Sequence, residues 1–467
     1  MHYRINVFTH TTPGETSMKI GKAQPLSLLL FIVIFIFCTC GAGNNEDHTT
    51  ITLNVPANAN LIQSLQKNVV DFADSSGISI KLIPFSGQEK LYAMLAAGKP
   101  PDIFYTNGVV RDKLAAEGHL ADLWTLCADD TFVQRIRPTF IEQGTSTDGG
   151  WYQFCDWTFT YGVYFNKNLF DTMGLPHPDD KWTWEDMLYC AKKLTQDQAL
   201  SAKKDRYGIF IARHFLSAFE RMNGTTYPKD ALFLDFPEQA LEVKQAYLDL
   251  IYKHHVMPEL NYVQAQGMQM SQMMNTGKVA MIVEAVPNLD FINALSVDWD
   301  LAPLPAFGKK TPAYFRAASG GLSISSACKH PEAAWKVIKF LVTQSDYNTP
   351  NPIFKDVDFV ASYLEKHPML REKNFAHVWK LSEKFDGGDS RDFVRYSSWS
   401  SHTILSELSP KLDLLYSGKI SLDELTDYKE EINRSVIREL RETLKNKNIK
   451  PAFRKQIQSG LKQYGIK

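Results

Sequence analysis

Short strand-like and helix-like patterns alternate along the first part of the chain. Apolar positions predict strands at residues 50–55, 78–83 and 102–105, and apolar residues three or four positions apart predict a helix after each strand. Strands that alternate with helices at this spacing indicate parallel βαβ units. In sheets of this kind, ligands bind beyond the carboxyl ends of the strands.

The middle and the end of the chain show other patterns. Residues 149–174 include nine aromatic side chains, and further apolar strands are predicted at 279–283 and 322–324. The last third is helical in pattern, with a predicted capping box at 421–424. The residues after Lys445 are basic, so we expect a solvated end there.

One longer apolar run, residues 26–38, lies near the N-terminus. It is shorter than the roughly 20 residues of a membrane-spanning helix and is typical of the core of a signal peptide. Two lysines precede the run at a suitable distance if translation starts at Met18 rather than Met1. The sequence therefore predicts export, with a signal peptide at 1–40 and a polar tether at 41–49.

A cysteine at the end of such a core is typical of a bacterial lipoprotein signal. Cys40 is the predicted acceptor, although Phe37 and Thr39 stand where Leu and a small residue are usual. Two acyl chains on this thiol make a stable membrane anchor, facing the periplasm or the cell exterior. The alternative is ordinary cleavage near Ala42, which releases a soluble protein.

Composition and charge exclude several classes of protein. The 467 residues include 51 Lys and Arg against 52 Asp and Glu, so the basic surplus of a nucleic-acid-binding protein is missing. The hydrophobic fraction of 44% is enough for substantial cores, and the length suggests two or three domains.

Motifs of catalysis and of metal binding are missing from the sequence. It contains no G-x-S-x-G, H-E-x-x-H or phosphate-loop pattern, and His254 and His255 are adjacent, so they cannot share a helix face. No pair of carboxylates stands out as an acid and a base. We expect no catalytic residue, no metal and no cofactor. Four scattered cysteines follow Cys40, and they leave disulfides and free thiols equally open: Cys127, Cys155, Cys190 and Cys328.

Several sequence blocks occur in a characteristic order. They are PDIFY (101–105), LAAEGHLADL (114–123), YFNKNLF (164–170), WTWED (182–186), GKVAM (277–281), PLP (303–305) and SGG (319–321). Together they resemble the extracellular solute-binding proteins of carbohydrate ABC importers, the group that includes maltose-binding protein. The resemblance covers residues from about Thr50 to Leu440.

This resemblance implies an α/β fold of two lobes, in the manner of periplasmic binding proteins, with hinge strands and a ligand cleft between the lobes. The chain is then expected to cross between the lobes near 157–161 and again near 301–305. The implied division is lobe 1 at 50–158 and 303–345, lobe 2 at 159–302 and 346–445, and a basic C-terminal tail at 446–467.

The resemblance also implies which residues contact a solute. Sugars are recognised by flat aromatic faces and by a few placed polar groups. The aromatic candidates are Trp157 and Tyr161 at the first crossing and Trp399 on a C-terminal helix. Packing in a core or between helices is the competing explanation for each.

The polar candidates follow predicted strands. Thr106 and Asn107 end the third strand, and Glu284 follows the strand at 279–283. Ser319, Gly320 and Gly321 resemble the small-residue loop of the family. The alternative for Asn107 is a structural asparagine in a turn, and for Glu284 it is a buried salt bridge. A tight turn would also explain the two glycines. Weaker candidates are Asn58, Gln88, Glu89 and Arg316, the last for an acidic solute.

The resemblance implies that the chain binds a solute and catalyses no reaction. A monomer, held at the membrane by its lipid anchor, is expected to capture a sugar or related solute and deliver it to an ABC permease and its ATPase. An exported glycoside-processing enzyme is one alternative. A solute-binding sensor that is not coupled to transport is another.

Overall fold

The computed structural model describes most of the chain after the predicted signal peptide. The described residues are 49–56, 59–85, 88–127, 129–156, 158–197, 204–225, 231–267, 269–308, 316–317, 320–343, 353–383 and 399–466. Among these residues, no helix is long and apolar enough to cross a membrane.

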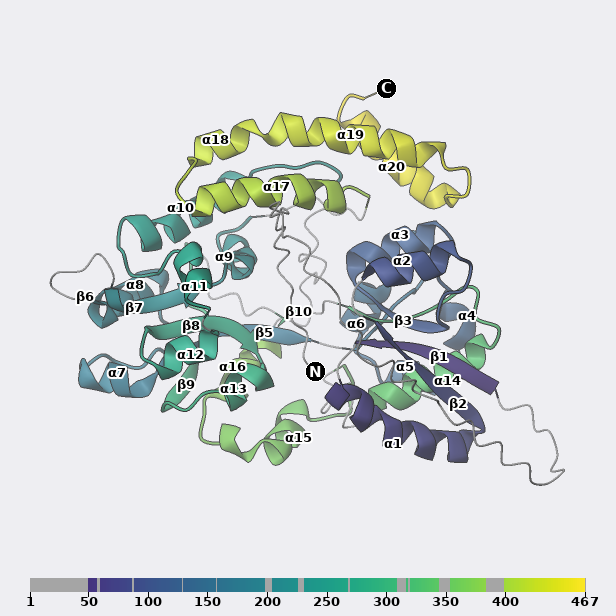
Figure 1. Ribbon diagram of the computed structural model, residues 1–467, viewed down its shortest axis with the longest axis horizontal. Helices are drawn as coiled ribbons and strands as arrows, with labels where there is room; N and C mark the ends of the chain where they lie inside the picture. The colour runs from purple at the N-terminus through teal and green to yellow at the C-terminus, as the bar shows by residue number, and fades with distance from the viewer. Residues whose placement is uncertain are drawn as a thin grey trace, which may run out of the picture.

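The first sheet lies on the right in Figure 1 and confirms the predicted βαβ pattern. Its strand order is β2-β1-β3-β11-β4; β1 is parallel to β2 and β3, whereas β11 is antiparallel to β3 and β4. The strands are β1 (Thr49–Pro56), β2 (Ile78–Phe85), β3 (Ile103–Thr106), β4 (Phe154–Cys155) and β11 (Gly321–Ile324). The helices that belong to it are α1 (Ala59–Ser76), α2 (Gln88–Ala96), α3 (Gly108–Ala116), α4 (Trp124–Cys127), α5 (Thr131–Gln134), α6 (Pro138–Gly144) and α14 (Pro331–Thr343).

The second sheet lies on the left in Figure 1. Its order is β10-β5-β8-β7-β6, and β9 also pairs with β5. The central strand β5 is buried at every position, which explains the dense aromatic and β-branched sequence there. The strands are β5 (Phe159–Asn166), β6 (Gln196–Asp197), β7 (Lys204–Ile211), β8 (Val279–Val286), β9 (Trp299–Pro303) and β10 (Arg316–Ala317).

Most of the remaining helices surround the second sheet. A capping box begins α8, with Thr183 and Asp186 bonding each other's backbone. These helices are α7 (Lys167–Thr172), α8 (Trp184–Leu194), η1 (Arg213–Phe215), α9 (Leu216–Met222), α10 (Glu238–Tyr252), α11 (Leu260–Gln266), α12 (Met270–Asn275), α13 (Leu289–Asn293), α15 (Phe359–Lys366), η2 (Pro368–Leu370) and α16 (Phe375–Glu383).

Three crossings between the lobes can be placed from the described residues. The first runs from β4 to β5, in the region that the sequence predicts. The sequence places the second near 301–305, but β9 and β10 both pair with β5, so the chain returns to the first sheet only between Ala317 and Gly321. Strand β9 ends at the 303–305 block, but the chain stays in the second lobe there. The two-residue strand β10, which follows later in the sequence, still pairs with Phe159 and Thr160 of β5. The last crossing lies between Val357, which packs on the core of the first lobe, and Phe359, which belongs to the core around the second sheet.

Each sheet has its own apolar core. The core of the first lobe includes a cluster of large rings. The ring centroid of Trp151 lies 5.8 Å from that of Phe154 and 6.0 Å from that of Trp335. The larger cluster surrounds the second sheet and extends along the C-terminal helices to apolar residues of α2 and α3.

The C-terminal helices form a layer above both sheets in Figure 1. They are α17 (Ser401–Tyr416), α18 (Leu422–Asp427), α19 (Lys429–Lys445) and α20 (Pro451–Gln463). The sequence predicts a solvated end after Lys445, whereas the structure has helix α20 there. Its residues Phe453, Ile457 and Leu461 recur at helical spacing and are buried, a face that the surrounding lysines and glutamines conceal in the sequence.

Candidate functional site

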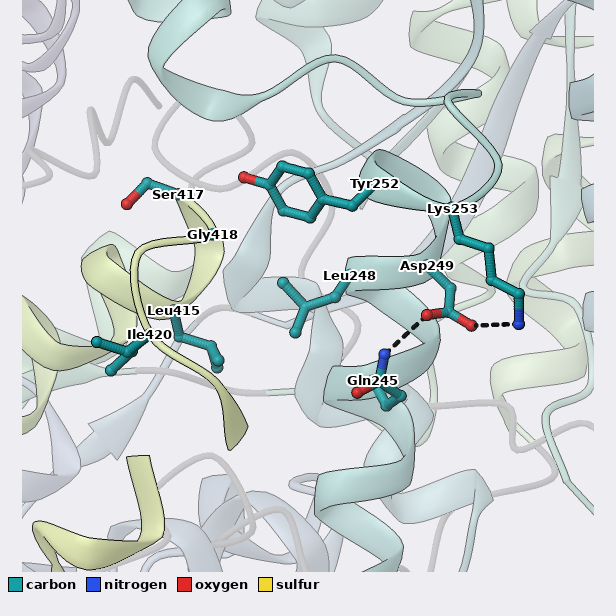
Figure 2. A pocket seen from close by; sticks show the side chains of 9 residues that line it. All are labelled: Gln245, Leu248, Asp249, Tyr252, Lys253, Leu415, Ser417, Gly418 and Ile420. Atoms are coloured by element: carbon teal, nitrogen blue, oxygen red, sulfur yellow. Dashed lines mark hydrogen bonds and ion pairs between the residues drawn. The ribbon is translucent and has the colours of Figure 1, made fainter. Parts of the chain in front are cut away.

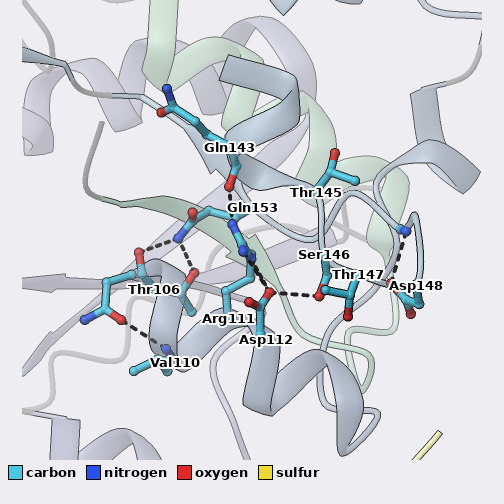
Figure 3. A network of polar contacts seen from close by, with 12 residues as sticks. Thr106, Val110, Arg111, Asp112, Gln143, Thr145, Ser146, Thr147, Asp148 and Gln153 are labelled. Carbon is cyan, nitrogen blue, oxygen red and sulfur yellow. Dashed lines mark hydrogen bonds and ion pairs between the residues drawn. The ribbon is translucent and has the colours of Figure 1, made fainter. Parts of the chain in front are cut away.

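The carboxyl end of β3 meets the start of β11 at one edge of the first sheet. Gly321 is opposite Thr106 on one side and Cys155 on the other. The Thr106 hydroxyl lies 2.7 Å from the Ser323 hydroxyl, and the Gln153 amide donates to the Thr106 carbonyl at 2.5 Å and to its hydroxyl at 2.7 Å. Figure 3 shows Gln153 reaching Thr106 in this way. The predicted residue Thr106 is therefore fully buried and already hydrogen-bonded.

Asn107 follows Thr106 and caps helix α3. Its side-chain oxygen accepts a hydrogen bond from Val110 N at 3.0 Å, so the turn explanation for this asparagine holds. The residue is half-buried, and its amide nitrogen makes no hydrogen bond within the described part of the chain. Capping leaves that nitrogen available as a donor.

Gly320 and Gly321 are required by close approach rather than by a tight turn. A Cβ atom at Gly320 would lie 2.1 Å from the Tyr105 hydroxyl, and one at Gly321 would lie 1.9 Å from the Phe154 carbonyl oxygen. Neither glycine has a positive φ. Their backbones consequently lie against neighbouring strands at this edge.

A network around Arg111 fixes the loop that carries Gln153 (Figure 3). The buried guanidinium donates to Asp112 and to the Gln143 carbonyl, and the Ser146 hydroxyl donates to Asp112 at 2.8 Å. These bonds tie residues 143–153 to α3, so Arg111 supports Thr106 indirectly.

Asn54, on the neighbouring strand β1, was missed by the sequence interpretation. Leu53 pairs with Ile103, so strand alternation places Asn54 on the same face as Thr106. Asn54 is buried, and its amide nitrogen has no hydrogen-bond partner within the described residues. A polar residue near the carboxyl end of an otherwise apolar strand is the signal that would have found it.

The matching edge of the second sheet holds aromatic and ionisable residues. The Tyr161 ring meets Phe215 edge-on at a centroid distance of 4.8 Å and lies 5.3 Å from Phe159. Burial, and secondarily the Glu284 carboxylate, raises the pKa of Tyr161 well above its usual value. Tyr161 is thus neutral and forms part of an aromatic wall near the start of β5.

Glu284 lies at the carboxyl end of β8 and is buried. Its Oε1 accepts a hydrogen bond from Ala285 N at 2.8 Å, while burial raises the carboxyl pKa. Register places Glu284 opposite Gly162 and Tyr161 opposite Ala285, so the two predicted residues point to opposite faces of the sheet. Within the described residues no salt bridge to Glu284 is present.

Arg213 and His214 follow β7 and were also missed. Ile211 pairs with Val283, which puts both residues level with the end of β8. Burial and the Arg213 charge lower the pKa of His214 to about 4, so its ring is neutral at pH 7. Arg213 forms an ion pair with Asp413 of α17. Two polar residues directly after a buried strand would have indicated this position.

The remaining predicted residues divide into two groups. Trp399 is buried at the start of α17, with its ring 6.0 Å from Phe453 of α20, as expected for packing between helices. Glu89 is exposed on α2. The others lie outside the described residues, or have side chains that do: Cys40, Asn58, Gln88, Trp157, Arg316 and Ser319.

The two edges are held close together by the connections between the sheets. Cys155 ends β4 and Phe159 begins β5, so these residues cannot lie more than about 14 Å apart. The same limit applies to Ala317 and Gly321. Neutral amides and hydroxyls of the first lobe therefore lie near aromatic and ionisable groups of the second.

Two further features of the described residues concern metal ligands and cysteine thiols. No group of three His, Cys, Asp or Glu side chains is arranged to hold a metal ion there. The four cysteines are free thiols, and burial raises the pKa of Cys155 to about 12.

A surface hollow between α10 and the turn after α17 contains none of the predicted residues (Figure 2). Asp249 there accepts hydrogen bonds from Gln245 at 2.7 Å and from Lys253 at 3.2 Å.

The chain belongs to the bacterial extracellular solute-binding protein family, whose model matches residues 58–346. This assignment agrees with the resemblance seen in the sequence blocks.

Solved structures of solute-binding proteins share the fold. An ABC substrate-binding protein of Listeria monocytogenes in complex with cycloalternan is 19% identical, with a TM-score of 0.65 over 83% of this chain and 99% of that one. The maltose/maltodextrin-binding domain of Bdellovibrio bacteriovorus bound to maltotriose is 18% identical, with a TM-score of 0.61 over 84% and 100%. A solute-binding protein of Agrobacterium radiobacter in complex with ribitol is 18% identical, with a TM-score of 0.62 over 83% and 98%. The two-lobed α/β fold expected from the sequence is thus confirmed.

Proposed function

We propose that this protein is an exported, lipid-anchored receptor that binds a carbohydrate or a related polyol between its lobes and delivers it to an ABC permease. The family membership and the ligands of the structures that share its fold support this proposal.

The buried amide of Asn54 is the observation that most directly supports a polar ligand rich in hydroxyl groups. A buried amide nitrogen without a partner costs free energy, because it has lost its hydrogen bonds to water. A solute hydroxyl would supply the missing acceptor. The half-buried amide of Asn107 and the first-turn N–H groups of α3 offer further donors beside it.

The second lobe would supply complementary contacts. The wall of Phe159, Tyr161 and Phe215 suits the apolar face of a sugar ring. Glu284, which points to the opposite face of the sheet near the same strand ends, suits a hydroxyl donor. The proposed contacts therefore include Asn54, Arg213 and His214 in addition to the residues predicted from the sequence. Trp157 and Ser319 remain proposed contacts, and Trp399 remains one at the border of the site.

Capture in this scheme is a change of population rather than a reaction. A solute that touches both lobes binds the closed form more tightly than the open form, and it shifts the equilibrium by that difference. The three crossings between the lobes would act as the hinge. The closed form would then dock on the permease.

A thermal-shift screen of the purified protein against sugars, polyols and sugar acids tests the proposal. A ligand at one hundred times its Kd stabilises the folded state by about 2.7 kcal/mol, which moves the unfolding midpoint by degrees. A saturable shift with the compound recovered unchanged supports a receptor. Recovery of a cleaved sugar would favour the glycoside-processing enzyme instead.

The lipid anchor is a separate part of the proposal. Acylation at Cys40 is tested by expressing the full chain and its Cys40→Ala variant in a bacterium and separating membrane from soluble fractions. Loss of membrane association only in the variant supports the anchor, whereas equal distribution indicates ordinary cleavage. Association with a permease and its ATPase, rather than a role as a sensor that is not coupled to transport, is tested by co-purification from membranes.

A further inference from the structure

Helix α20 contacts both lobes of the molecule. It follows α19 at the end of the chain and folds back above α2 and α3 in Figure 1. Its apolar residues belong to a buried cluster that includes the second sheet, α17 and α19, and also Leu91, Val110 and Leu114 of the first lobe. When the lobes separate, a segment that contacts both of them has to lose its contacts with one.

The attachment to the second lobe is made by packed rings and a buried amide. Phe453 packs against Trp399, and Tyr464 stacks on Phe233 with ring centroids 4.0 Å apart. Asn433 of α19 donates to the Tyr464 hydroxyl at 3.0 Å and also binds the backbone of Leu234. Helix α17, on which this layer rests, is joined to the second sheet by the ion pair between Asp413 and Arg213.

The attachment to the first lobe converges on Lys450, directly before α20. Its backbone N–H donates to the Ala116 carbonyl at the end of α3, at 3.1 Å. Its ammonium group donates to the Tyr152 hydroxyl at 2.7 Å and lies 3.5 Å from Asp148. One further polar contact joins Thr147 to Gln456 of α20 at 3.1 Å.

We propose that residues 446–466 form a strap that holds the two lobes together, with the contacts of Lys450 to Ala116, Tyr152 and Asp148 as its releasable end. Lys450 is partly exposed, so water and salt compete for its contacts, whereas Phe453, Ile457 and Leu461 are buried. The strap moves with the second lobe and detaches from the first when the lobes open. It thereby adds to the stability of the closed form, whatever the solute.

Lys450→Met, studied without ligand, tests the strap. The variant keeps the aliphatic stem and removes the charge. We expect a larger radius of gyration by small-angle X-ray scattering, and exchange of the Lys450 backbone amide with deuterium that is about two- to fivefold faster. The amides around Ile457 and Leu461 should keep their protection. Tyr152→Phe, which removes one hydroxyl only, should shift both readouts in the same direction by less.

Lys445→Met is the matched control. Lys445 lies in the last turn of α19 and pairs with Glu442 on an exposed surface, and no hydrogen bond or ion pair joins it to the first lobe in the described part of the chain. It should leave both readouts unchanged. Raising the salt concentration should mimic Lys450→Met in the original protein and have less effect in the variant.

An unchanged radius of gyration in Lys450→Met and Tyr152→Phe would overturn the proposal, because the contacts would then not limit lobe separation. Loss of protection throughout α20 would overturn it as well, because Lys450 would then hold the helix itself rather than the lobes. These readouts do not require the solute, so their failure is distinct from a failure of the ligand screen.

Discussion

The two lobes treat polar groups differently. At its edge the first lobe places neutral amides and hydroxyls, Asn54, Thr106, Gln153 and Ser323, of which most bond one another. The second lobe places the ionisable residues Arg213, His214 and Glu284 at the corresponding edge. Away from these residues both lobes hold ion pairs, among them the largely buried Arg111–Asp112 pair behind the edge of the first lobe. The ion pair of Glu220 with Lys244 in the second lobe is almost completely buried, whereas that of Asp130 with Lys339 in the first is partly exposed.

This difference indicates a division of labour. Neutral groups held by a hydrogen-bond network give a fixed shape for solute hydroxyls at little electrostatic cost. Buried ionisable groups make the second lobe sensitive to pH and to the charge of the solute. Four substitutions break or sharpen this comparison, from the largest expected effect to the smallest.

Lys244→Met should destabilise the protein most. It leaves the Glu220 carboxylate buried beside an apolar side chain, which costs about 3–5 kcal/mol when one partner of a buried pair is removed. Chemical denaturation measures the loss. Lys339→Met in the first lobe is the matched change and should cost less than about 1 kcal/mol because that pair is partly exposed. Equal losses for the two variants would contradict the comparison.

Gly321→Ala should disrupt the edge of the first sheet. The added Cβ would lie 1.9 Å from the Phe154 carbonyl oxygen, so β11 and β4 must move apart, at a cost of about 3 kcal/mol. The thermal midpoint reports the change. Gly98→Asn serves as the control, because the site is open and asparagine tolerates its left-handed backbone. A stable Gly321→Ala variant would mean that the strands separate without cost.

Glu284→Gln should weaken solute binding roughly tenfold to a hundredfold, the loss of one hydrogen bond to a charged group. Its effect on stability has the opposite sign. Burial raises the folded-state pKa of Glu284, so the residue contributes most below its unfolded pKa and loses that contribution as the pH rises through the folded value. The variant should therefore exceed the original protein in thermal midpoint at pH 8, and the difference should shrink toward pH 4.

Calorimetric titration with the solute from the screen, together with midpoints across the pH range, measures both effects. Asp298→Asn is a suitable control, because this carboxylate lies on an exposed surface of the second lobe. A stability difference for Glu284→Gln that grew toward low pH would show the opposite sign and refute the account of its burial.

Asn54→Leu should have the smallest effect on stability, and that effect should be favourable. Replacing a buried amide that lacks a partner with an apolar group of similar size is worth about 1 kcal/mol. Solute binding should nevertheless fall. Thermal midpoints with and without solute separate the two results. A destabilised variant that binds normally would make Asn54 a structural residue only.

The local parts of the fold were predictable because short-range patterns specify them. The alternating strands at 50–105 and the capping box at Ser421 appear where the sequence places them. Thr106 and Gly321 were also expected at the site, and strand pairing brings them together. That Thr106 is buried and hydrogen-bonded was not predictable, because its hydroxyl accepts a hydrogen bond from Gln153, 47 residues away in the chain.

The less predictable parts depend on long-range contacts. The return to the first sheet is delayed by β10, whose two residues pair with β5 more than 150 positions earlier, and no local pattern marks so short a strand. Asn107 was expected as a contact, and its cap on α3 accounts for its oxygen but not for its nitrogen. Trp399 was expected beside a solute, and the packing of Phe453 against it depends on α20, whose charged exposed face made the end of the chain look solvated.

By itself the sequence determined the class of protein, the alternation of strands and helices, and the strand ends at which polar residues gather. The class of protein follows from the resemblance of the ordered sequence blocks, and the other two properties follow from periodicity and from local chemistry along the chain. Only the tertiary structure decided which of those polar groups are satisfied, which face each occupies, and that the last helix joins the two lobes. Burial and hydrogen bonding are properties of the partners that folding brings together, and those partners lie tens to hundreds of residues apart.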